Sequence, residues 1–306
     1  MSLGLVCHWL EKNKKGVYEN ILGERSLQLT SYKNNKYSND YINEVYKNNI
    51  FGLDKVLSKI IQNNIKCYRI SSSLFPLTDI VDRNLWDNNY YRSIFKKYGD
   101  LIKKNNIRIT CHPGQFVSLT SLNSEVIRNS ISELDYHAWM LDSMELDLSP
   151  YYAINIHGGK RDSADILIKN INNLPNNIKS RLTLENDECS YNVLQLKQIS
   201  DLTKVPICFD SHHHTFNTGN ITLNNAYEIA IKTWGDIKPL QHLSNTNPEE
   251  YLTSFQDRRK HSDFVHYFPA IQYEANMKNE IDVEMEFKMK NIAIFDWLKK
   301  TCNKIN

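Results

Sequence analysis

Histidine and carboxylate side chains stand at the ends of successive apolar stretches of this sequence. His112 follows one stretch, His157 follows the next, and Glu185 and Asp210 end two more. Imidazole nitrogens and carboxylate oxygens together make ligand sets for divalent metal ions. Taken singly, each residue has an ordinary interpretation, because a histidine at a strand end often only makes hydrogen bonds and a carboxylate often caps a helix. The repetition of the pattern therefore matters more than any one residue.

The same pattern continues toward the C-terminus. Three histidines, His212 to His214, follow Asp210 after one serine, His242 lies in a seventh stretch, and Glu286 ends an eighth. Charged groups gathered at one place are costly unless their charge is neutralised, and metal ions neutralise it. If the stretch ends converge in space, the sequence predicts a cluster of divalent ions.

The stretches themselves indicate how the chemistry is positioned. They are short, apolar or β-branched, and occupy Leu3–Cys7, Lys66–Ile70, Ile107–Cys111, Tyr152–Ile156, Leu182–Glu185, Ile207–Asp210, Leu240–Leu243 and Ile281–Glu286. Between them apolar residues recur at three- and four-residue steps, as at Leu53, Val56 and Leu57, which is typical of amphipathic helices. Strand and helix in alternation predict a parallel sheet. Eight units in about 300 residues favour a single-domain (β/α)8 TIM barrel over residues 1–306.

In such a barrel the C-terminal ends of all strands meet at one mouth, so the histidines and carboxylates would converge there. Two long polar segments, 11–46 and 245–270, are expected to lie on this same face. A doubly wound open sheet is the structural alternative. No GxGxxG motif follows the first stretch, however, so dinucleotide binding has no support.

Composition narrows the class of protein. The chain has 306 residues and a net charge of +2, from 37 basic and 35 acidic residues, which neither demands nor excludes a nucleic-acid partner. No apolar run reaches the roughly 18 residues of a membrane span. The six cysteines are widely spaced without a CxxC pair. We therefore expect a protein of the cytoplasm, without a disulfide framework or a membrane partner.

Two further features lie beside these stretches. Gly158 and Gly159 permit close approach of a ligand to the backbone, and Lys160 adds a positive charge there. An ordinary glycine turn with a solvated lysine explains the same residues equally well. Gln115 and Phe116 present an amide and an aromatic ring that suit contact with a base stack, although Phe116 taken alone is more typical of a packing residue.

At these residues the sequence resembles the ultraviolet damage endonuclease family. The matching segments run in order along almost the whole chain: Tyr68–Pro76, His112–Phe116, Asn155–Lys160, Leu184–Asp187, Asp210–His214, His242–Ser244, His261–Asp263 and Met285–Lys288. Any one of these segments would be weak evidence, whereas the ordered set is specific.

The resemblance implies an endonuclease IV-like TIM barrel that cuts double-stranded DNA immediately 5′ to ultraviolet photoproducts, such as cyclobutane pyrimidine dimers and 6-4 photoproducts. By position, His112, His157 and Glu185 would hold one ion, and Glu185 would bridge to a second. The second ion would be held by Glu185, Asp210, His242 and Glu286, which are also the expected catalytic residues. His213 and His261 would belong to a third. Gln115 and Phe116 would probe the lesion, with Lys160 also contacting DNA.

Mn²⁺ is the expected cofactor, and Zn²⁺ or Mg²⁺ would also suit the ligands. Family members commonly carry a lysine two residues before the histidine of the seventh strand, and in some of them it is carboxylated and binds the third ion. This chain has Leu240 there. We therefore expect two tightly held ions and a third that is weak, absent or replaced by water, in a protein that acts as a monomer.

Three other functions stay open at this point. A metal-dependent sugar isomerase or epimerase on a similar barrel would use comparable ligands in a small closed pocket. An apurinic-site endonuclease would share the phosphodiester chemistry, and abasic sites are a possible substrate in either case. An inactive DNA-binding relative is disfavoured by the complete ligand set.

Overall fold

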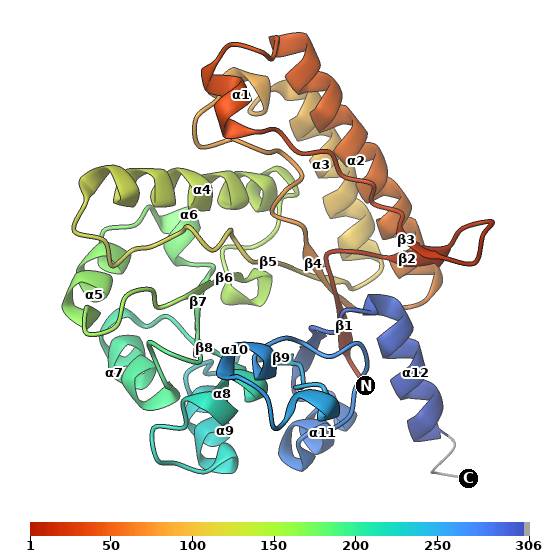
Figure 1. The fold of residues 1–306 in the computed structure, drawn as a ribbon. Coiled ribbons are helices and arrows are strands. Elements are labelled where there is room, and N and C mark those ends of the chain that lie inside the picture. The colour runs from red at the N-terminus through yellow and green to blue at the C-terminus, as the bar shows by residue number, and fades with distance from the viewer. Residues whose placement is uncertain (303–306) are drawn as a thin grey trace.

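Eight parallel strands close into a barrel in the computed structural model, which describes residues 1–302 (Figure 1). Around the barrel each strand pairs with the next one in the chain, and β1 closes the ring by pairing with both β4 and β10. The barrel strands are β1 Leu3–Val6, β4 Cys67–Ile70, β5 Arg108–Cys111, β6 Ile154–His157, β7 Leu182–Glu185, β8 Ile207–Asp210, β9 Leu240–Leu243 and β10 Asp282–Met285. All eight coincide with the predicted stretches, and the TIM-barrel prediction is confirmed.

Helices surround the barrel (Figure 1). The α-helices are α1 Leu29–Lys33, α2 Asn39–Gln62, α3 Asn89–Lys104, α4 Ser124–Ser143, α5 Ala164–Asn172, α6 Asn176–Lys179, α7 Val193–Thr203, α8 Ser211–Phe216, α9 Leu223–Lys232, α10 Phe255–Arg258, α11 Ala270–Met277 and α12 Lys290–Cys302. Short 3₁₀ turns are η1 Arg83–Leu85, η2 Pro150–Tyr152 and η3 Pro248–Glu250, and β2 Leu10–Lys12 pairs with β3 Tyr18–Asn20 as an antiparallel hairpin. None of the helices in residues 1–302 combines the length and apolar character of a membrane-spanning segment.

Polar residues before the helices explain where several of them begin. Ser38 accepts a hydrogen bond from the Tyr41 amide at the start of α2, and Asn88 does the same for Tyr91 at the start of α3. Asn192 and Gln195 form a reciprocal capping box at the start of α7. Such side chains satisfy amide groups that have no partner inside the helix.

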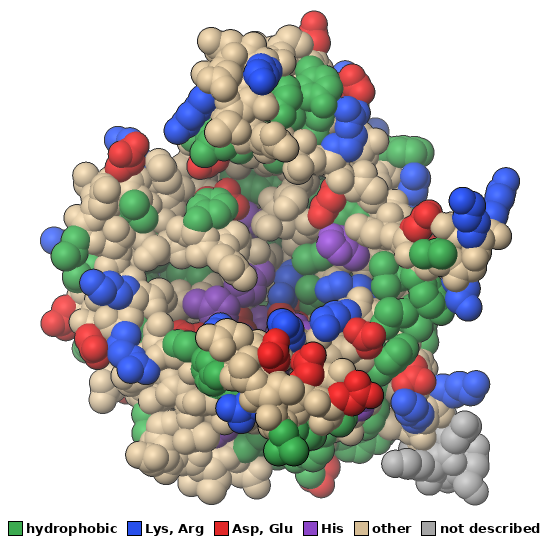
Figure 2. Space-filling view, viewed as in Figure 1, with side chains coloured by type: hydrophobic (Ala, Val, Ile, Leu, Met, Phe, Trp, Pro, Cys, Tyr) green, Lys and Arg blue, Asp and Glu red, His purple; other side chains and the backbone are tan. Residues whose placement is uncertain are grey.

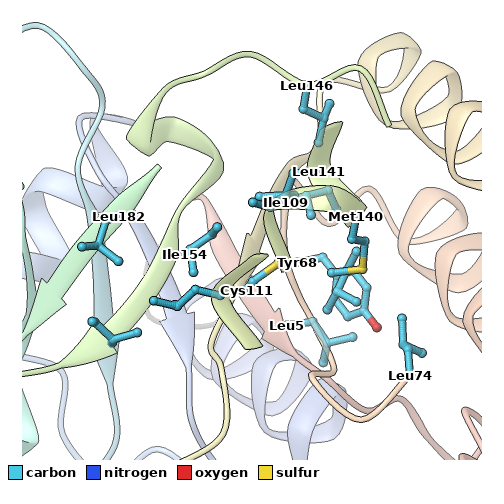
Figure 3. Packing of buried hydrophobic residues seen from close by; sticks show 14 of the residues in the cluster. Leu5, Tyr68, Leu74, Ile109, Cys111, Met140, Leu141, Leu146, Ile154 and Leu182 are labelled. Atoms are coloured by element: carbon cyan, nitrogen blue, oxygen red, sulfur yellow. The ribbon is translucent and has the colours of Figure 1, made fainter. Parts of the chain in front are cut away.

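Alternate residues of the strands face outward and inward. Leu5, Tyr68 and Ile109 point away from the barrel axis and pack with Met140 and Leu141 of α4 (Figure 3). This packing between barrel and helices forms the main hydrophobic core. The residues between them in the sequence face inward, because their side chains contact strands on other parts of the barrel wall.

The barrel interior is partly polar. Near its base Arg108 of β5 pairs with Asp282 of β10 at 3.0 Å, and both are buried. A small apolar cluster of Cys67, Ala153, Cys208, Trp234 and Leu240 also lies inside the fold. Above it, toward the C-terminal strand ends, the interior becomes polar again and opens into the candidate site.

The two long polar segments differ in position. Gln256, Arg259, Lys260 and His261, all from segment 245–270, line the cavity at the barrel mouth. No residue of segment 11–46 is among the described residues lining that cavity. The segment instead forms the β2–β3 hairpin, α1 and the start of α2.

Candidate metal centre at the barrel mouth

A cavity of about 890 Å³ opens at the C-terminal ends of the strands. Figure 2 shows this hollow with histidine side chains in its depth and basic side chains near it. Eight of the predicted site residues line it: His112, Gln115, His157, Lys160, Glu185, His213, His261 and Glu286. Asp210 and His242 lie deeper and are completely buried. The predicted convergence of strand ends is thus present in the fold.

Glu185 lies at the centre of the cluster. Its two carboxylate oxygens lie 3.2 Å from His112 Nε2, 3.2 Å from His213 Nδ1 and 3.1 Å from His242 Nδ1. The Asn155 amide donates to the same carboxylate at 2.5 Å. Residues at the ends of strands β5, β8 and β9 therefore meet at the single carboxyl group that ends β7.

The possible metal-ligand atoms form three overlapping groups. The first is His112, His157 and Glu185, the second is Glu185, Asp210 and His213, and the third is Asp210, His242 and Glu286. Within each group the ligand atoms lie within 4.8 Å of one another. Glu185 and Asp210 are each shared by two groups, which is the arrangement that bridging carboxylates require.

Two buried atoms support a fit to metal ions. Among the described residues, His157 Nδ1 and Asp210 Oδ2 have no hydrogen-bond partner. Buried polar atoms are almost always paired, so an unpaired imidazole nitrogen and an unpaired carboxylate oxygen in one site call for a cation. Both are ordinary ligand atoms for Mn²⁺ and Zn²⁺.

The pKa shifts of the buried carboxylate and histidine side chains also indicate a site that suits a cation. Burial would raise the pKa of Glu185, but His242 and His157 outweigh burial and hold that pKa well below its usual value. Burial would lower the pKa of His213, but Asp210 and Glu185 raise it well above the usual value. Glu185 is therefore ionised, and the positive charge of the His213 imidazolium stabilises it in the way that a divalent cation would.

His213 and His261, which the resemblance assigns to one third ion, contact different carboxylates in the structure. His213 follows Asp210 on α8, and its Nε2 lies 3.7 Å from Glu188 Oε1. His261 Nε2 faces Glu286 Oε2 at 3.7 Å. Of the ligand groups found in residues 1–302, one contains His213 and none contains His261. Leu240 packs in the apolar cluster inside the fold.

Gln115 and Phe116 occupy the loop between β5 and α4. Gln115 lines the cavity, whereas Phe116 does not and is 58% exposed. The Phe116 ring lies against Gly114, where an added Cβ would come within 2.5 Å of the ring. Lys160 also lines the cavity, and its backbone amide donates to Thr120 Oγ1 at 2.7 Å.

Four charged residues of the site were not singled out from the sequence. Arg69 of β4 pairs with Glu286 at 2.5 Å and also with Glu284. Glu188 pairs with Arg259 at 2.9 Å. The spacing Asp282, Glu284, Glu286 was a usable signal for Glu284, because a two-residue step along a strand places all three on one face.

The whole chain is similar to proteins of known family. The model of the family described as UV-endonuclease UvdE matches residues 1–306. A UV DNA damage endonuclease of Nostoc sp. is 35% identical over 302 residues, which are 96% of this chain and 88% of the relative. A crystal structure of SacUVDE is 31% identical, with a TM-score of 0.80 and 99% of each chain covered.

More distant structures share the fold alone. Endonuclease IV from Thermus thermophilus has a TM-score of 0.54 at 10% identity, covering 80% of this chain and 94% of the other. D-psicose 3-epimerase from Clostridium cellulolyticum has a TM-score of 0.51 at 11% identity, covering 93% and 84%. The full-length family match and the relative in Nostoc carry the assignment, and this chain belongs to the UV-endonuclease UvdE family.

Proposed function

We propose that this protein is a metal-dependent DNA repair endonuclease that hydrolyses the phosphodiester bond 5′ to ultraviolet photoproducts. The observation that carries the proposal is the position of Glu185 between two groups of histidines and carboxylates on the floor of an open cavity. The names of the relatives, UV DNA damage endonuclease, supply the substrate class. A phosphodiester is anionic and resists attack, so its hydrolysis needs neutralised charge and an activated water.

The proposed ligand assignment uses the first and third ligand groups and adds Glu185 to the third as the bridge. His112, His157 and Glu185 hold one ion, and Glu185, Asp210, His242 and Glu286 hold the second. Bound divalent ions would supply Lewis acidity and charge neutralisation at the phosphate. The chain itself contributes the fixed separation of the ligands, because Glu185 and Asp210 end neighbouring strands of a rigid barrel.

The remaining site residues would bind and orient DNA. Lys160, Arg259 and Lys260 line the cavity and place positive charge beside it, which suits contacts to the phosphate backbone. Gln115 and Phe116 project from the rim loop, the segment between β5 and α4, where we place the contact with the lesion. Damaged bases stack more weakly, so a duplex is easier to open at a photoproduct than elsewhere.

Mn²⁺ is the cofactor that we propose, with two ions per chain. The third ion of the resemblance would have to use His213 and His261 without an anionic group from position 240. Two neutral imidazoles with water bind a divalent ion more weakly than a set that includes a carboxylate-type oxygen. Elemental analysis after dialysis tests this count, and three Mn²⁺ per chain at full occupancy would contradict it.

Incision of supercoiled plasmid is the direct test. We expect nicking of ultraviolet-irradiated plasmid with MnCl₂, little nicking of undamaged plasmid, and none with EDTA. Plasmid carrying abasic sites, run in parallel, separates the photoproduct activity from an apurinic-site endonuclease. Nicking of irradiated plasmid that is unaffected by EDTA would overturn the metal mechanism.

Substitution of the proposed bridging residue, Glu185, tests the metal mechanism most directly. Glu185→Gln keeps the size of the side chain but removes the charge shared by two ligand groups, so incision should fall by orders of magnitude together with metal content. Glu249→Gln, an exposed carboxylate beyond β9, is the matched control and should behave as wild type. Near-normal incision by Glu185→Gln would remove Glu185 from the centre of the mechanism.

A sugar epimerase remains the competing class, because D-psicose 3-epimerase shares the fold. The volume of the cavity favours the endonuclease, since a monosaccharide fills only a small part of about 890 Å³. Epimerisation of ketohexoses with Mn²⁺, in the absence of any plasmid incision, would reverse the choice.

We further propose that the single barrel domain acts as a monomer inside the cell. Light scattering of the purified protein tests the oligomeric state.

A further inference from the structure

Glu284 is a buried carboxylate inside the barrel, one inward-facing position before Glu286 on β10. Its side chain is completely inaccessible. Gly4 of β1 leaves space for it, because a Cβ at that position would lie 3.1 Å from Glu284 Cγ. Arg69 Nε donates to Glu284 at 2.6 Å, and the Thr110 hydroxyl also donates to it. Glu284 therefore has two hydrogen-bond donors and a space that fits its side chain, so the barrel interior holds it in one position.

Glu284 also contacts one of the proposed metal ligands. His242 Nε2 lies 3.1 Å from Glu284 Oε2. The other ring nitrogen, Nδ1, lies 3.1 Å from Glu185 and 3.4 Å from Glu286. His242 therefore presents Nδ1 to the proposed metal centre and Nε2 to Glu284, while Arg69 Nη2 lies beside the ring, 3.4 Å from Nδ1.

The proton on a neutral imidazole decides which nitrogen can coordinate a metal ion. Coordination through Nδ1 requires a free lone pair there, so the proton must sit on Nε2 and needs an acceptor. Glu284 is such an acceptor. Arg69 Nη2 also lies 2.7 Å from Nε2, but a guanidinium only donates and would favour the opposite tautomer. The Cys208 thiol, which also contacts the ring, is a weak partner by comparison.

We propose that Glu284 is the positioning residue of the metal centre, which holds the proton of His242 on Nε2 and turns Nδ1 toward the ions. A carboxylate behind a metal-bound histidine is a recurring way to fix the ring and increase its basicity. The proposal rests on the proposed metal function and adds to it a residue that does not itself coordinate.

The same carboxylate keeps Arg69 paired. Arg69 Nη1 lies 2.5 Å from Glu286, which is itself a proposed ligand. An ion that takes Glu286 would leave the buried guanidinium without that partner, and an unpaired buried charge is costly. Glu284 gives Arg69 a second carboxylate that no ion needs. Glu286 is thereby free to bind metal without leaving Arg69 uncompensated.

Metal affinity of the variant Glu284→Met tests the proposal. Metal-free protein is titrated with MnCl₂, and free Mn²⁺ is measured by its electron paramagnetic resonance signal. We expect one ion to bind about 10- to 100-fold more weakly in Glu284→Met than in wild type, with the other ion little changed. In the Zn²⁺-loaded wild type, ¹⁵N-histidine labelling should show a strongly downfield, slowly exchanging Nε2 proton that is missing from the variant.

Three further variants separate positioning from general disruption. Thr110→Val removes the other side-chain donor to Glu284 without touching His242 and should bind Mn²⁺ as wild type. Asp282→Asn removes a buried carboxylate on the same strand that pairs with Arg108 and Lys238 instead, and it should also retain both ions.

Glu284→Gln keeps an amide oxygen that can accept the Nε2 proton, so it should restore part of the affinity lost in Glu284→Met. This variant decides the question if Glu284→Met does not fold.

The outcomes distinguish this inference from the proposed function. Wild-type protein that binds no Mn²⁺ would defeat the metal function and the inference together. A second result is that wild-type protein binds two ions while Glu284→Met and Glu284→Gln bind Mn²⁺ with the wild-type affinity. That result would overturn only the role of Glu284. If Asp282→Asn lost as much Mn²⁺ affinity as Glu284→Met, the role of Glu284 would also be overturned. The effect would then come from the loss of a buried negative charge inside the barrel and not from the contact with His242.

Discussion

Glu133 is a buried carboxyl group of α4 that supports the rim loop. It is only 6% exposed, and the Gly114 backbone amide donates a hydrogen bond to it. Burial, with a further contribution from Asp79, raises the pKa of Glu133 from 4.5 to about 7. Its neighbour His137 is shifted in the opposite direction, because burial lowers the pKa of that imidazole to about 4.

The raised pKa of Glu133 predicts a pH-dependent stability. Below pH 4.5 the group is protonated in both the folded and the unfolded protein and costs nothing. As the pH rises from 4.5 to about 7 the unfolded chain ionises first, so folding stability falls by about 3 kcal/mol. Glu133→Gln removes this loss, and the stability difference between variant and wild type should grow across that window, as measured by urea unfolding at several pH values.

The comparison with wild type isolates this group, because His137 is present in both proteins. Glu125→Gln changes an exposed carboxylate on the same helix, 70% accessible at its side chain, and should show no such dependence. A stability difference for Glu133→Gln that stays constant across the same pH window would contradict the assignment.

At the scale of single elements, the rim loop between β5 and α4 can be tested separately from the chemistry. Phe116→Ala should weaken binding to irradiated duplex by about 1–3 kcal/mol, the contribution of one lost contact between a base and an aromatic ring. Metal content should not change, because Phe116 is outside the ligand groups. Fluorescence anisotropy with damaged and undamaged duplexes measures the effect.

Phe51→Ala is the matched control for this loop. Phe51 is 60% exposed on α2, nearly the same as Phe116 at 58%, and it does not line the cavity. Loss of metal or of folded structure in Phe116→Ala would instead identify the ring as a packing residue.

The contact between α3 and α4 gives a second prediction at this scale. Gly99 is buried within α3, and a Cβ there would lie 1.9 Å from the Met144 carbonyl oxygen at the end of α4. Alanine is the better helix former by about 1 kcal/mol, but the overlap requires the two helices to separate. Gly99→Ala should therefore lower the free energy of unfolding by about 1–3 kcal/mol.

The exposed residue Lys97 on the same helix provides the comparison. Lys97→Ala should leave stability nearly unchanged in the same chemical denaturation experiment. An increase in stability for Gly99→Ala would show that helix propensity outweighs the steric contact.

Element positions were predictable from the sequence to different degrees. All eight barrel strands were visible, because a strand that is buried on both faces is a short apolar run. The β2–β3 hairpin was not, since its residues are mostly polar and none of them is buried. The three histidines after Asp210 form part of the helix α8, and Asp210 itself caps that helix by accepting from the His213 amide at 2.7 Å.

The candidate site was predictable where its residues stand at strand ends. His112, Glu185 and Asp210 needed only the assumption of a closed barrel. Arg69 and Glu284 lie inside strands, where a charged residue gives no indication of its partner until the barrel register is known. The pairing of Arg69 with Glu284, 215 positions away, follows only from the closure of β1 against β4 and β10.

At the scale of the whole molecule, metal binding and folding should be coupled. The proposed ligands come from several strands and from the segments that follow them, so an ion holds together parts of the chain that separate on unfolding. Mn²⁺ at 100 times its dissociation constant should stabilise the protein by about 2.7 kcal/mol per site, which raises the melting temperature by several degrees. Glu185→Gln should show a much smaller rise in a thermal scan with increasing MnCl₂. A melting temperature independent of MnCl₂ in the wild type would argue against ions bridging the strands.

The closure of the barrel by its first and last strands has a consequence during protein synthesis. β1 is made first but has only β4 as a partner until β10 is complete at Met285. Glu286 follows directly, and His242 acquires its neighbour Glu284 only at the same moment. A nascent chain that has not yet reached β10 therefore lacks part of the second proposed ion site. The closed ring of strands and that ion site are therefore completed together, when β10 joins β1 and β9.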